Sequence, residues 1–90
     1  MTPQTPDIVM YSTGWCPYCD RARPLLARKG LTVREIKVDE NPAEREAMLA
    51  RSGGRRTVPQ IFIGERHVGG FDDLYAIDTS GELDTLTDRA

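Results

Sequence analysis

The sequence has few of the residues that hold metals or cross membranes. It contains two cysteines and a single histidine, His67. A structural zinc site needs about four nitrogen or sulfur ligands, so these three side chains supply one only if a second subunit completes it. No segment approaches the roughly 18 apolar residues of a membrane-spanning helix. The expectation is therefore a chain that holds no metal and does not span a membrane.

Charge and terminal composition narrow the class of protein further. A net charge of −2 and a pI near 5.3 argue against nucleic acid as the main partner. Residues 1–6 have neither the basic run nor the apolar core of a secretion signal, so we expect a flexible tail followed by one domain over residues 7–90. Without an export signal, the thiols are expected in a reducing cytoplasm, where disulfides are usually transient and catalytic.

Both cysteines lie in one tetrapeptide, CPYC at residues 16–19. The apolar residues 8–11 before it predict a buried strand, and Ala22, Leu25 and Leu26 after it begin a helical pattern. The tetrapeptide therefore lies where a strand passes into the first turn of a helix. Unpaired backbone N–H groups and the helix dipole favour a thiolate at that position, and a C-x-x-C placed there is typical of redox chemistry.

Two other roles for the cysteine pair are less consistent with the sequence. A structural disulfide would close a very short loop and would restrict the unfolded chain little. Inert buried cysteines would not account for the adjacent Gly14 and Pro17, which are typical of a strand-to-helix junction. The residues themselves therefore favour a redox pair.

The rest of the pattern predicts alternating strands and helices in the order βαβαββα. The predicted strands cover residues 8–11, 31–38, 58–63 and 66–68, and the predicted helices begin at Pro17, Pro42 and Asp72 or Asp73. Leu83 and Leu86 predict a short final turn or helix. The first two strands should be parallel with a right-handed crossover, and the last two should form an antiparallel hairpin. This order predicts an α/β domain in which helices flank a four-stranded mixed sheet.

Three motifs together resemble the dithiol glutaredoxins of the thioredoxin superfamily. They are Cys16-Pro17-Tyr18-Cys19, Thr57-Val58-Pro59 and Gly69-Gly70-Phe71-Asp72-Asp73. Their spacing and the element order also fit, so the resemblance covers the chain from Asp7 onward. It implies a thioredoxin-like fold and a cis peptide bond before Pro59.

The resemblance implies a glutathione-dependent thiol–disulfide oxidoreductase that reduces protein disulfides and glutathione mixed disulfides. Cys16, at the helix start, is the expected nucleophile, and Cys19, one turn farther in, is the expected resolving thiol. Glutathione is the expected reducing co-substrate, and no metal is required. The expected partners are disulfide-bonded or glutathionylated proteins, with neither nucleic acid nor membrane, and the expected state is a monomer.

The resemblance also implies a glutathione-binding set. Its expected members are Tyr18, Arg55, Arg56, Thr57, Val58, Pro59, Gly70, Phe71, Asp72 and Asp73. The Val58 backbone pairs with the cysteinyl backbone of glutathione in the family. Asp72 and Asp73 are expected to cap a helix whose free N–H groups can bind the γ-glutamyl carboxylate.

One departure from the family pattern concerns a lysine that often lies three residues before the nucleophile. Thr13 occupies that position here, and Arg55 and Arg56 are either substitutes for its charge or solvated loop residues. The departure, together with Trp15, leaves open an electron supply from thioredoxin reductase or from another small thiol such as mycothiol. His67 is expected to be a solvent-facing strand residue.

A third possibility comes from a different functional class. The chain could bind an iron–sulfur cluster between two subunits through Cys16 and bound glutathione. The clearest cluster binders of the family have glycine after the nucleophile, so Pro17 speaks against this role.

Overall fold

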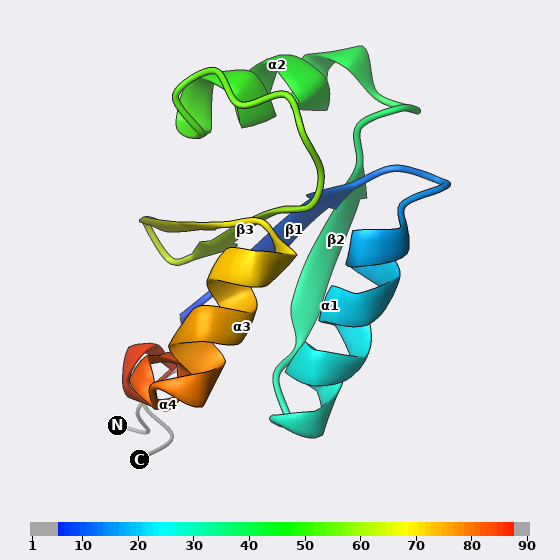
Figure 1. The fold of residues 1–90 in the computed structure, drawn as a ribbon. Helices are drawn as coiled ribbons and strands as arrows, with labels where there is room; N and C mark the ends of the chain where they lie inside the picture. The colour runs from blue at the N-terminus through cyan, green and yellow to red at the C-terminus, as the bar shows by residue number, and fades with distance from the viewer. Residues whose placement is uncertain (1–5, 88–90) are drawn as a thin grey trace.

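The computed structural model describes residues 6–87 and places a four-stranded sheet between helices (Figure 1). The elements are β1 (Ile8–Ser12), α1 (Pro17–Arg28), β2 (Val33–Lys37), α2 (Pro42–Arg51), β3 (Gln60–Ile63), β4 (Arg66–Gly69), α3 (Phe71–Thr79) and α4 (Glu82–Leu86). This confirms the predicted α/β class and strand-helix order, with α4 as the short final helix. The predicted tail, apart from Pro6, and residues 88–90 of the predicted domain lie outside the described residues.

The sheet combines parallel and antiparallel pairing in the order β2-β1-β3-β4. β1 runs parallel to β2, and the connection between them contains α1. β3 runs antiparallel to both β1 and β4. Because β1 has a neighbour on each side and helices on both faces, all five of its residues are buried. The chain leaves the end of this buried strand directly into the cysteine motif.

The helices cover the sheet in two layers. α2 lies on one face, while α1 and α3 lie next to each other on the opposite face (Figure 1). Side chains alternate between the two faces of a strand. Ile8 and Met10 of β1 therefore belong to the core beneath α1 and α3. Val9 and Tyr11 belong to the core beneath α2. No helix among residues 6–87 is long and apolar enough to cross a bilayer.

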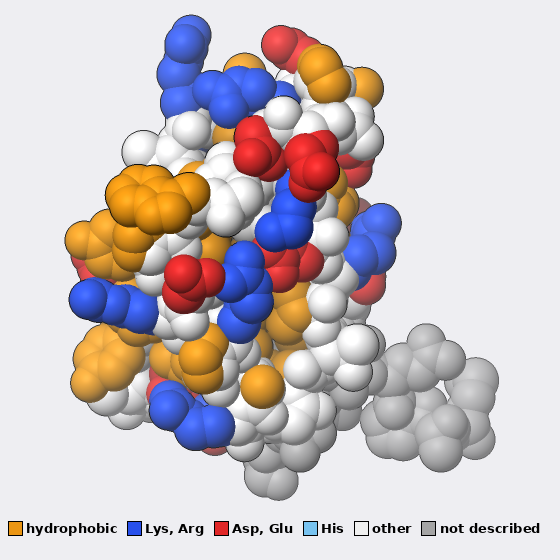
Figure 2. Space-filling model, turned by 90° about the vertical axis from the view of Figure 1, so that its right-hand side faces the viewer, with side chains coloured by type: hydrophobic (Ala, Val, Ile, Leu, Met, Phe, Trp, Pro, Cys, Tyr) orange, Lys and Arg blue, Asp and Glu red, His pale blue; other side chains and the backbone are white. Residues whose placement is uncertain are grey.

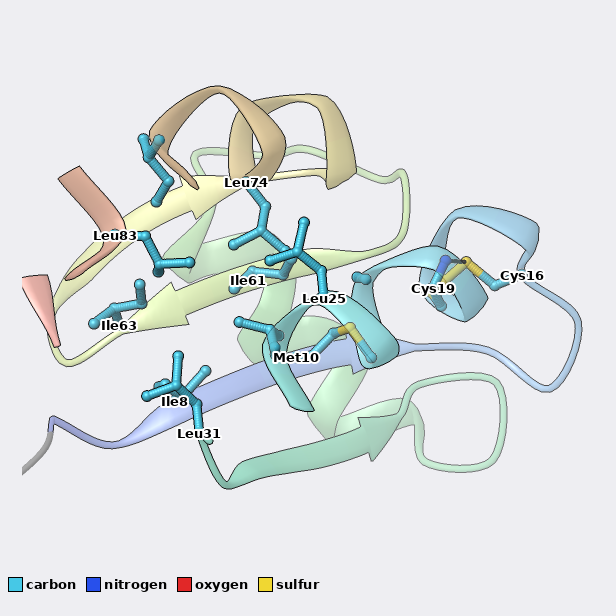
Figure 3. Close-up of a cluster of buried hydrophobic side chains, with 13 residues drawn as sticks. Ile8, Met10, Cys16, Cys19, Leu25, Leu31, Ile61, Ile63, Leu74 and Leu83 are labelled. Atoms are coloured by element: carbon cyan, nitrogen blue, oxygen red, sulfur yellow. Dashed lines mark hydrogen bonds between the residues drawn. A yellow bond between two sulfur atoms is a disulfide. The ribbon is translucent and has the colours of Figure 1, made fainter. Parts of the chain in front are cut away.

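The core beneath α1 and α3 is the larger of the two, and it contains both cysteines. Its buried members are Ile8, Met10, Cys16, Cys19, Ala22, Leu25, Leu26, Leu31, Ile61, Ile63, Leu74, Ile77 and Leu83. Figure 3 shows the disulfide at one end of this cluster, at the start of α1. The cysteine pair is therefore held by the same apolar packing that holds α1 on the sheet.

The smaller core holds α2 on the other face of the sheet. Met48 of α2 packs there with Tyr11 and Phe62, whose rings meet edge-on at a centroid distance of 5.8 Å. Arg51, the last residue of α2, places its guanidinium 4.1 Å from the centre of the Phe62 ring and donates to the Tyr11 hydroxyl at 3.0 Å. This cation–π contact fixes the end of α2, from which the chain continues toward β3.

Two helices begin at the prolines that the sequence predicts. Pro17 is the first residue of α1, after Cys16 as N-cap, and Pro42 is the first residue of α2. Asn41 caps α2 by accepting a hydrogen bond from the Glu44 N–H at 3.3 Å. Proline suits the first helical position because its missing N–H would have no partner within the helix.

Two strands are shorter than predicted. β2 covers only Val33–Lys37, although Leu31 and Val38 on either side of it are buried. Pro59 precedes β3 instead of belonging to it, which agrees with the inability of proline to donate to a strand ladder. In both cases an apolar run extends beyond the hydrogen-bonded strand.

Ionic contacts hold α1 against β2. Glu35 accepts two hydrogen bonds from Arg23, at 2.7 Å from Nε and 2.6 Å from Nη2, and a third from the Ser12 hydroxyl. Arg23 also pairs with Asp20. The bonds from Arg23 are the largest cause that lowers the pKa of Glu35 to about 2. Figure 2 shows acidic and basic side chains next to one another across one face of the molecule.

We expect Glu35→Gln to lower the free energy of unfolding at neutral pH by about 1–3 kcal/mol. The pKa of Glu35 is about 2 in the fold, against an ordinary value of 4.5. Its ionised form therefore stabilises the protein fully above about pH 4.5, and this contribution is lost as the pH falls toward 2. Urea unfolding at a series of pH values should show the difference between wild type and variant shrinking over that window.

Glu46→Gln is the matched control, because Glu46 is an exposed glutamate on α2. It should change the free energy of unfolding by less than about 0.5 kcal/mol at any pH. A wild-type advantage over Glu35→Gln that stays constant from neutral to acidic pH would contradict the role given to the ionised carboxylate.

Candidate active site

The two cysteines lie at the first turn of α1 and form a disulfide, with their Cα atoms 5.2 Å apart. Cys16 is the N-cap residue, and its sulfur accepts the backbone N–H of Cys19 at 3.1 Å. Both side chains are largely enclosed, with Cys16 6% exposed and Cys19 0% exposed. The more exposed of the two cysteines is therefore the one at the positive end of the helix.

The loop between β1 and α1 is held at its glycine. The Gly14 N–H donates to the Asp39 carboxylate at 3.0 Å, and the Thr13 hydroxyl donates to the Trp15 carbonyl at 3.0 Å. Asp39 follows β2, and because β1 and β2 are parallel, both chains leave the sheet at the same edge. The hydrogen bond between Gly14 and Asp39 therefore holds the loop that leads to Cys16.

The chemistry available to this arrangement is the interconversion of a dithiol and a disulfide. A helix N-terminus stabilises negative charge through its free N–H groups and its dipole. In the reduced protein, the N–H of Cys19 would donate to a thiolate on Cys16, and a thiolate is the species that attacks disulfides. Cys19, one turn into the helix, is close enough to close the bridge again.

A pocket of about 520 Å³ lies next to the helix start, and the residues expected to bind glutathione come together around it. Its lining consists of Tyr18, Arg55, Arg56, Thr57, Val58, Pro59, Gly70, Phe71, Asp72 and Asp73. Tyr18 lies between the two cysteines in the chain. Val58 and Phe71 pack against the core cluster that contains both cysteines. The pocket and the disulfide therefore share one packed framework.

One wall of the pocket is the segment between α2 and β3. The Ser52 hydroxyl accepts the Arg55 N–H at 3.1 Å and donates to the Arg55 carbonyl at 3.2 Å, so it closes a tight turn after α2. The Val58–Pro59 peptide bond is cis, as the resemblance implied. Both Thr57 and Pro59 line the pocket, but Thr57 is exposed whereas Pro59 is largely buried.

The opposite wall is the start of α3, where the predicted cap is wrong. Gly70 is the N-cap, and Asp73 accepts the Gly70 N–H at 3.0 Å from within the first turn, while Asp72 is exposed. The Asp73 carboxylate also lies 3.8 Å from the Arg55 guanidinium, so the two walls meet in an ion pair. Gly69 has φ of +119°, and a side chain there would collide with the Asp73 carboxylate.

Gln60 is a polar residue of this region that no motif in the sequence singles out. It is 0% exposed, and its amide donates to the Thr57 carbonyl at 2.9 Å and to the Thr57 hydroxyl at 3.2 Å. The amide oxygen faces His67 Nε2 at 2.6 Å. The available signal was a single glutamine within the apolar run of residues 58–63.

The expectation that His67 faces solvent is wrong. Its ring stacks on Phe62 with the centroids 4.7 Å apart, and it is half-buried. Burial lowers the pKa of His67 below its ordinary value, and the positive charge of Arg55 adds to the effect. The imidazole is therefore neutral at neutral pH and acts as a packed hydrogen-bonding group.

The remaining aromatic residues near the cysteines are exposed. Trp15 is 83% exposed directly before Cys16, and Tyr18 is 51% exposed with the Arg21 guanidinium 5.5 Å from its ring centre. Within residues 6–87, no three His, Cys, Asp or Glu side chains come together as possible metal ligands.

Known proteins resemble this chain in both sequence and fold. The Glutaredoxin family model matches residues 8–68. A curated glutaredoxin of Pseudomonas aeruginosa is 57% identical over 81 residues, which are 90% of this chain and 95% of that protein. The solution structure of glutaredoxin from Brucella melitensis has a TM-score of 0.83 and 48% identity, covering 99% of this chain and 96% of that one. The crystal structure of a buckwheat glutaredoxin–glutathione complex has a TM-score of 0.82 and 31% identity, covering 92% and 77%.

Proposed function

The chain belongs to the glutaredoxin family of thiol–disulfide oxidoreductases, and we propose that glutathione is its reductant. The observation that supports the proposal is the pocket next to the start of α1, which is lined by the residues that the resemblance implies for glutathione binding. The buckwheat glutaredoxin, which has a similar fold, has been crystallised as a complex with glutathione. In this proposal, the pocket selects the glutathionyl half of a disulfide and brings its sulfur to Cys16.

The pocket offers matched groups for each part of glutathione. The Val58 backbone can pair with the cysteinyl backbone, and the first turn of α3 leaves N–H groups free for the γ-glutamyl carboxylate. Asp73 is already engaged by Gly70 and Arg55, so the exposed Asp72 is the better placed acceptor for the ammonium. Arg55 and Arg56 supply positive charge for the remaining carboxylate.

With a glutathionylated protein, the reaction needs only Cys16. Its thiolate attacks the glutathionyl sulfur, the protein thiolate leaves, and a Cys16–glutathione mixed disulfide forms. A second glutathione thiolate then attacks the glutathionyl sulfur of this intermediate. Glutathione disulfide leaves, and the Cys16 thiolate is restored.

With a protein disulfide, the reaction needs both cysteines. Cys16 forms a mixed disulfide with the substrate, and the Cys19 thiolate attacks the Cys16 sulfur to release the substrate dithiol. The resulting bridge is the one present in the structure. Two glutathione molecules reduce it in turn and leave as glutathione disulfide.

One observation favours a second candidate, in which another small thiol or thioredoxin reductase supplies the electrons. Thr13 replaces the lysine that often precedes the nucleophile in the family, and its hydroxyl bonds to the Trp15 carbonyl in the loop. Arg55 is partly matched by Asp73. The two candidate electron donors therefore differ in one requirement. Glutathione needs a positive charge in the pocket for one of its carboxylates, and the second candidate does not.

Single-cysteine variants test the proposed mechanism. With a glutathionylated peptide, glutathione, glutathione reductase and NADPH, we expect Cys19→Ser to retain most of the turnover, because glutathione itself resolves the mixed disulfide. The same variant should lose reduction of a protein disulfide. Cys16→Ser should lose both activities, and normal turnover of Cys16→Ser in either assay would contradict the assignment of the nucleophile.

The double variant Arg55→Gln/Arg56→Gln tests the positive charge at the pocket. We expect the KM for glutathione to rise about five- to thirtyfold, equivalent to about 1–2 kcal/mol, with little change in kcat, because uniform binding is what is lost. Added salt should weaken the wild type more than the variant, since exposed ion pairs are screened.

Arg45→Gln is a matched control on α2, because Arg45 does not line the pocket. It should leave the KM for glutathione unchanged. A double variant with the wild-type KM would show that Arg55 and Arg56 are solvated loop residues, and it would favour the candidate with a different electron donor.

A further inference from the structure

We propose that Gln60 is a positioning residue, which orients the Thr57–Val58 peptide so that the Val58 N–H faces the pocket. This inference rests on the proposed use of glutathione, because it concerns the backbone that would pair with the tripeptide. Gln60 itself does not line the pocket. It acts from the buried side, beneath the wall formed by residues 55–59.

The amide of Gln60 has only one satisfactory orientation. The Thr57 carbonyl can only accept a hydrogen bond, so the atom 2.9 Å from it is the Gln60 amide nitrogen. The amide oxygen then points to His67 Nε2 at 2.6 Å, which must carry a proton in order to donate. Gln60 is 0% exposed, so these partners replace the water that the amide has lost.

The bond to the Thr57 carbonyl controls the next N–H of the chain. The Thr57 carbonyl and the Val58 N–H belong to one planar peptide unit. This unit is trans, because the cis bond of the segment is the following one, Val58–Pro59. In a trans peptide the carbonyl and the N–H point in opposite directions. A carbonyl held toward the buried Gln60 therefore directs the Val58 N–H away from the core, toward the side where the pocket lies.

His67 fixes Gln60 in turn. Its ring is held against Phe62, the second residue after Gln60 on β3, at a centroid distance of 4.7 Å. Burial and the nearby Arg55 keep the imidazole neutral, and its Nε2–H serves the Gln60 oxygen. The chain of contacts therefore runs from a stacked ring on β4, through β3, to the pocket wall.

Packing alone does not require glutamine at this position. A buried amide is costly unless all of its groups have partners, and leucine or methionine would fill a similar volume without that requirement. Here the amide reaches a backbone carbonyl in a segment that has no strand partner, directly before the cis peptide. The polar group therefore fits a role in holding the backbone of the pocket wall.

The test compares two disulfides as oxidants of the reduced protein. Glutathione disulfide carries the peptide backbone, whereas bis(2-hydroxyethyl) disulfide has none. Trp15 is the only tryptophan and precedes Cys16, so its fluorescence in a stopped-flow instrument can report the first exchange step. Wild type should react faster with glutathione disulfide. Gln60→Met should lose about three- to tenfold of that rate, while its rate with bis(2-hydroxyethyl) disulfide stays within about twofold of wild type.

Two further variants keep the result interpretable. Gln60→Leu also removes the donor to the Thr57 carbonyl and has a similar volume, so it should show the same selective loss even if Gln60→Met folds poorly. Val9→Ala removes apolar volume from the core beneath α2, and Val9 does not line the pocket. It should lower stability and leave the ratio of the two rates unchanged.

The outcomes distinguish the positioning role of Gln60 from the proposed use of glutathione. A Gln60 variant that keeps the wild-type preference, or that slows with both disulfides equally, would overturn the positioning role and leave the proposed function intact. A wild type without any preference for glutathione disulfide would overturn the proposed function, and this inference with it.

Discussion

The backbone N–H of Cys19 points at the Cys16 sulfur from the first turn of α1, and the surrounding structure keeps that contact in place. β1 delivers the chain to this point from the centre of the sheet. The Gly14 N–H donates a hydrogen bond to Asp39, and Arg23 of α1 donates one to Glu35 of β2. The helix start stabilises a thiolate only while the sulfur stays next to it. These two hydrogen bonds therefore contribute to reactivity as well as to stability.

The pocket depends on a second feature of the topology, the meeting of two segments that are separate in sequence. The segment before β3 and the start of α3 are brought together by the antiparallel hairpin of β3 and β4. The Arg55–Asp73 ion pair and the close approach of Gly69 to Asp73 join the two walls. Gln60 and His67, one on each strand of the hairpin, hold the first wall from the buried side. The hairpin is thus the frame of the proposed glutathione site.

Much of this could be predicted from the sequence, because its signals are local. The CPYC motif at residues 16–19, the helix start at Pro42 and the hairpin of β3 and β4 each depend on neighbours a few residues away. The positions of Gln60 and His67 could not be predicted in the same way. Their hydrogen bond joins two strands, and His67 stacks on Phe62, which itself packs with Met48 of α2. An isolated polar residue in the sequence does not reveal such partners. The cap of α3 could not be located for a related reason: an aspartate near a helix start can either be the cap itself or, as Asp73 does from within the first turn, accept the N–H of the cap residue.

The most direct test of the account is an ultraviolet titration of the thiolate in the reduced protein. The absorbance should rise in a step that belongs to Cys16, with a pKa well below the free-thiol value of about 8.5, and the step should persist in Cys19→Ser. That result would show that the start of α1 activates the nucleophile before any substrate binds. A Cys16 transition at or above the free-thiol value would contradict the central claim, because the helix start would then do nothing for the sulfur that it holds.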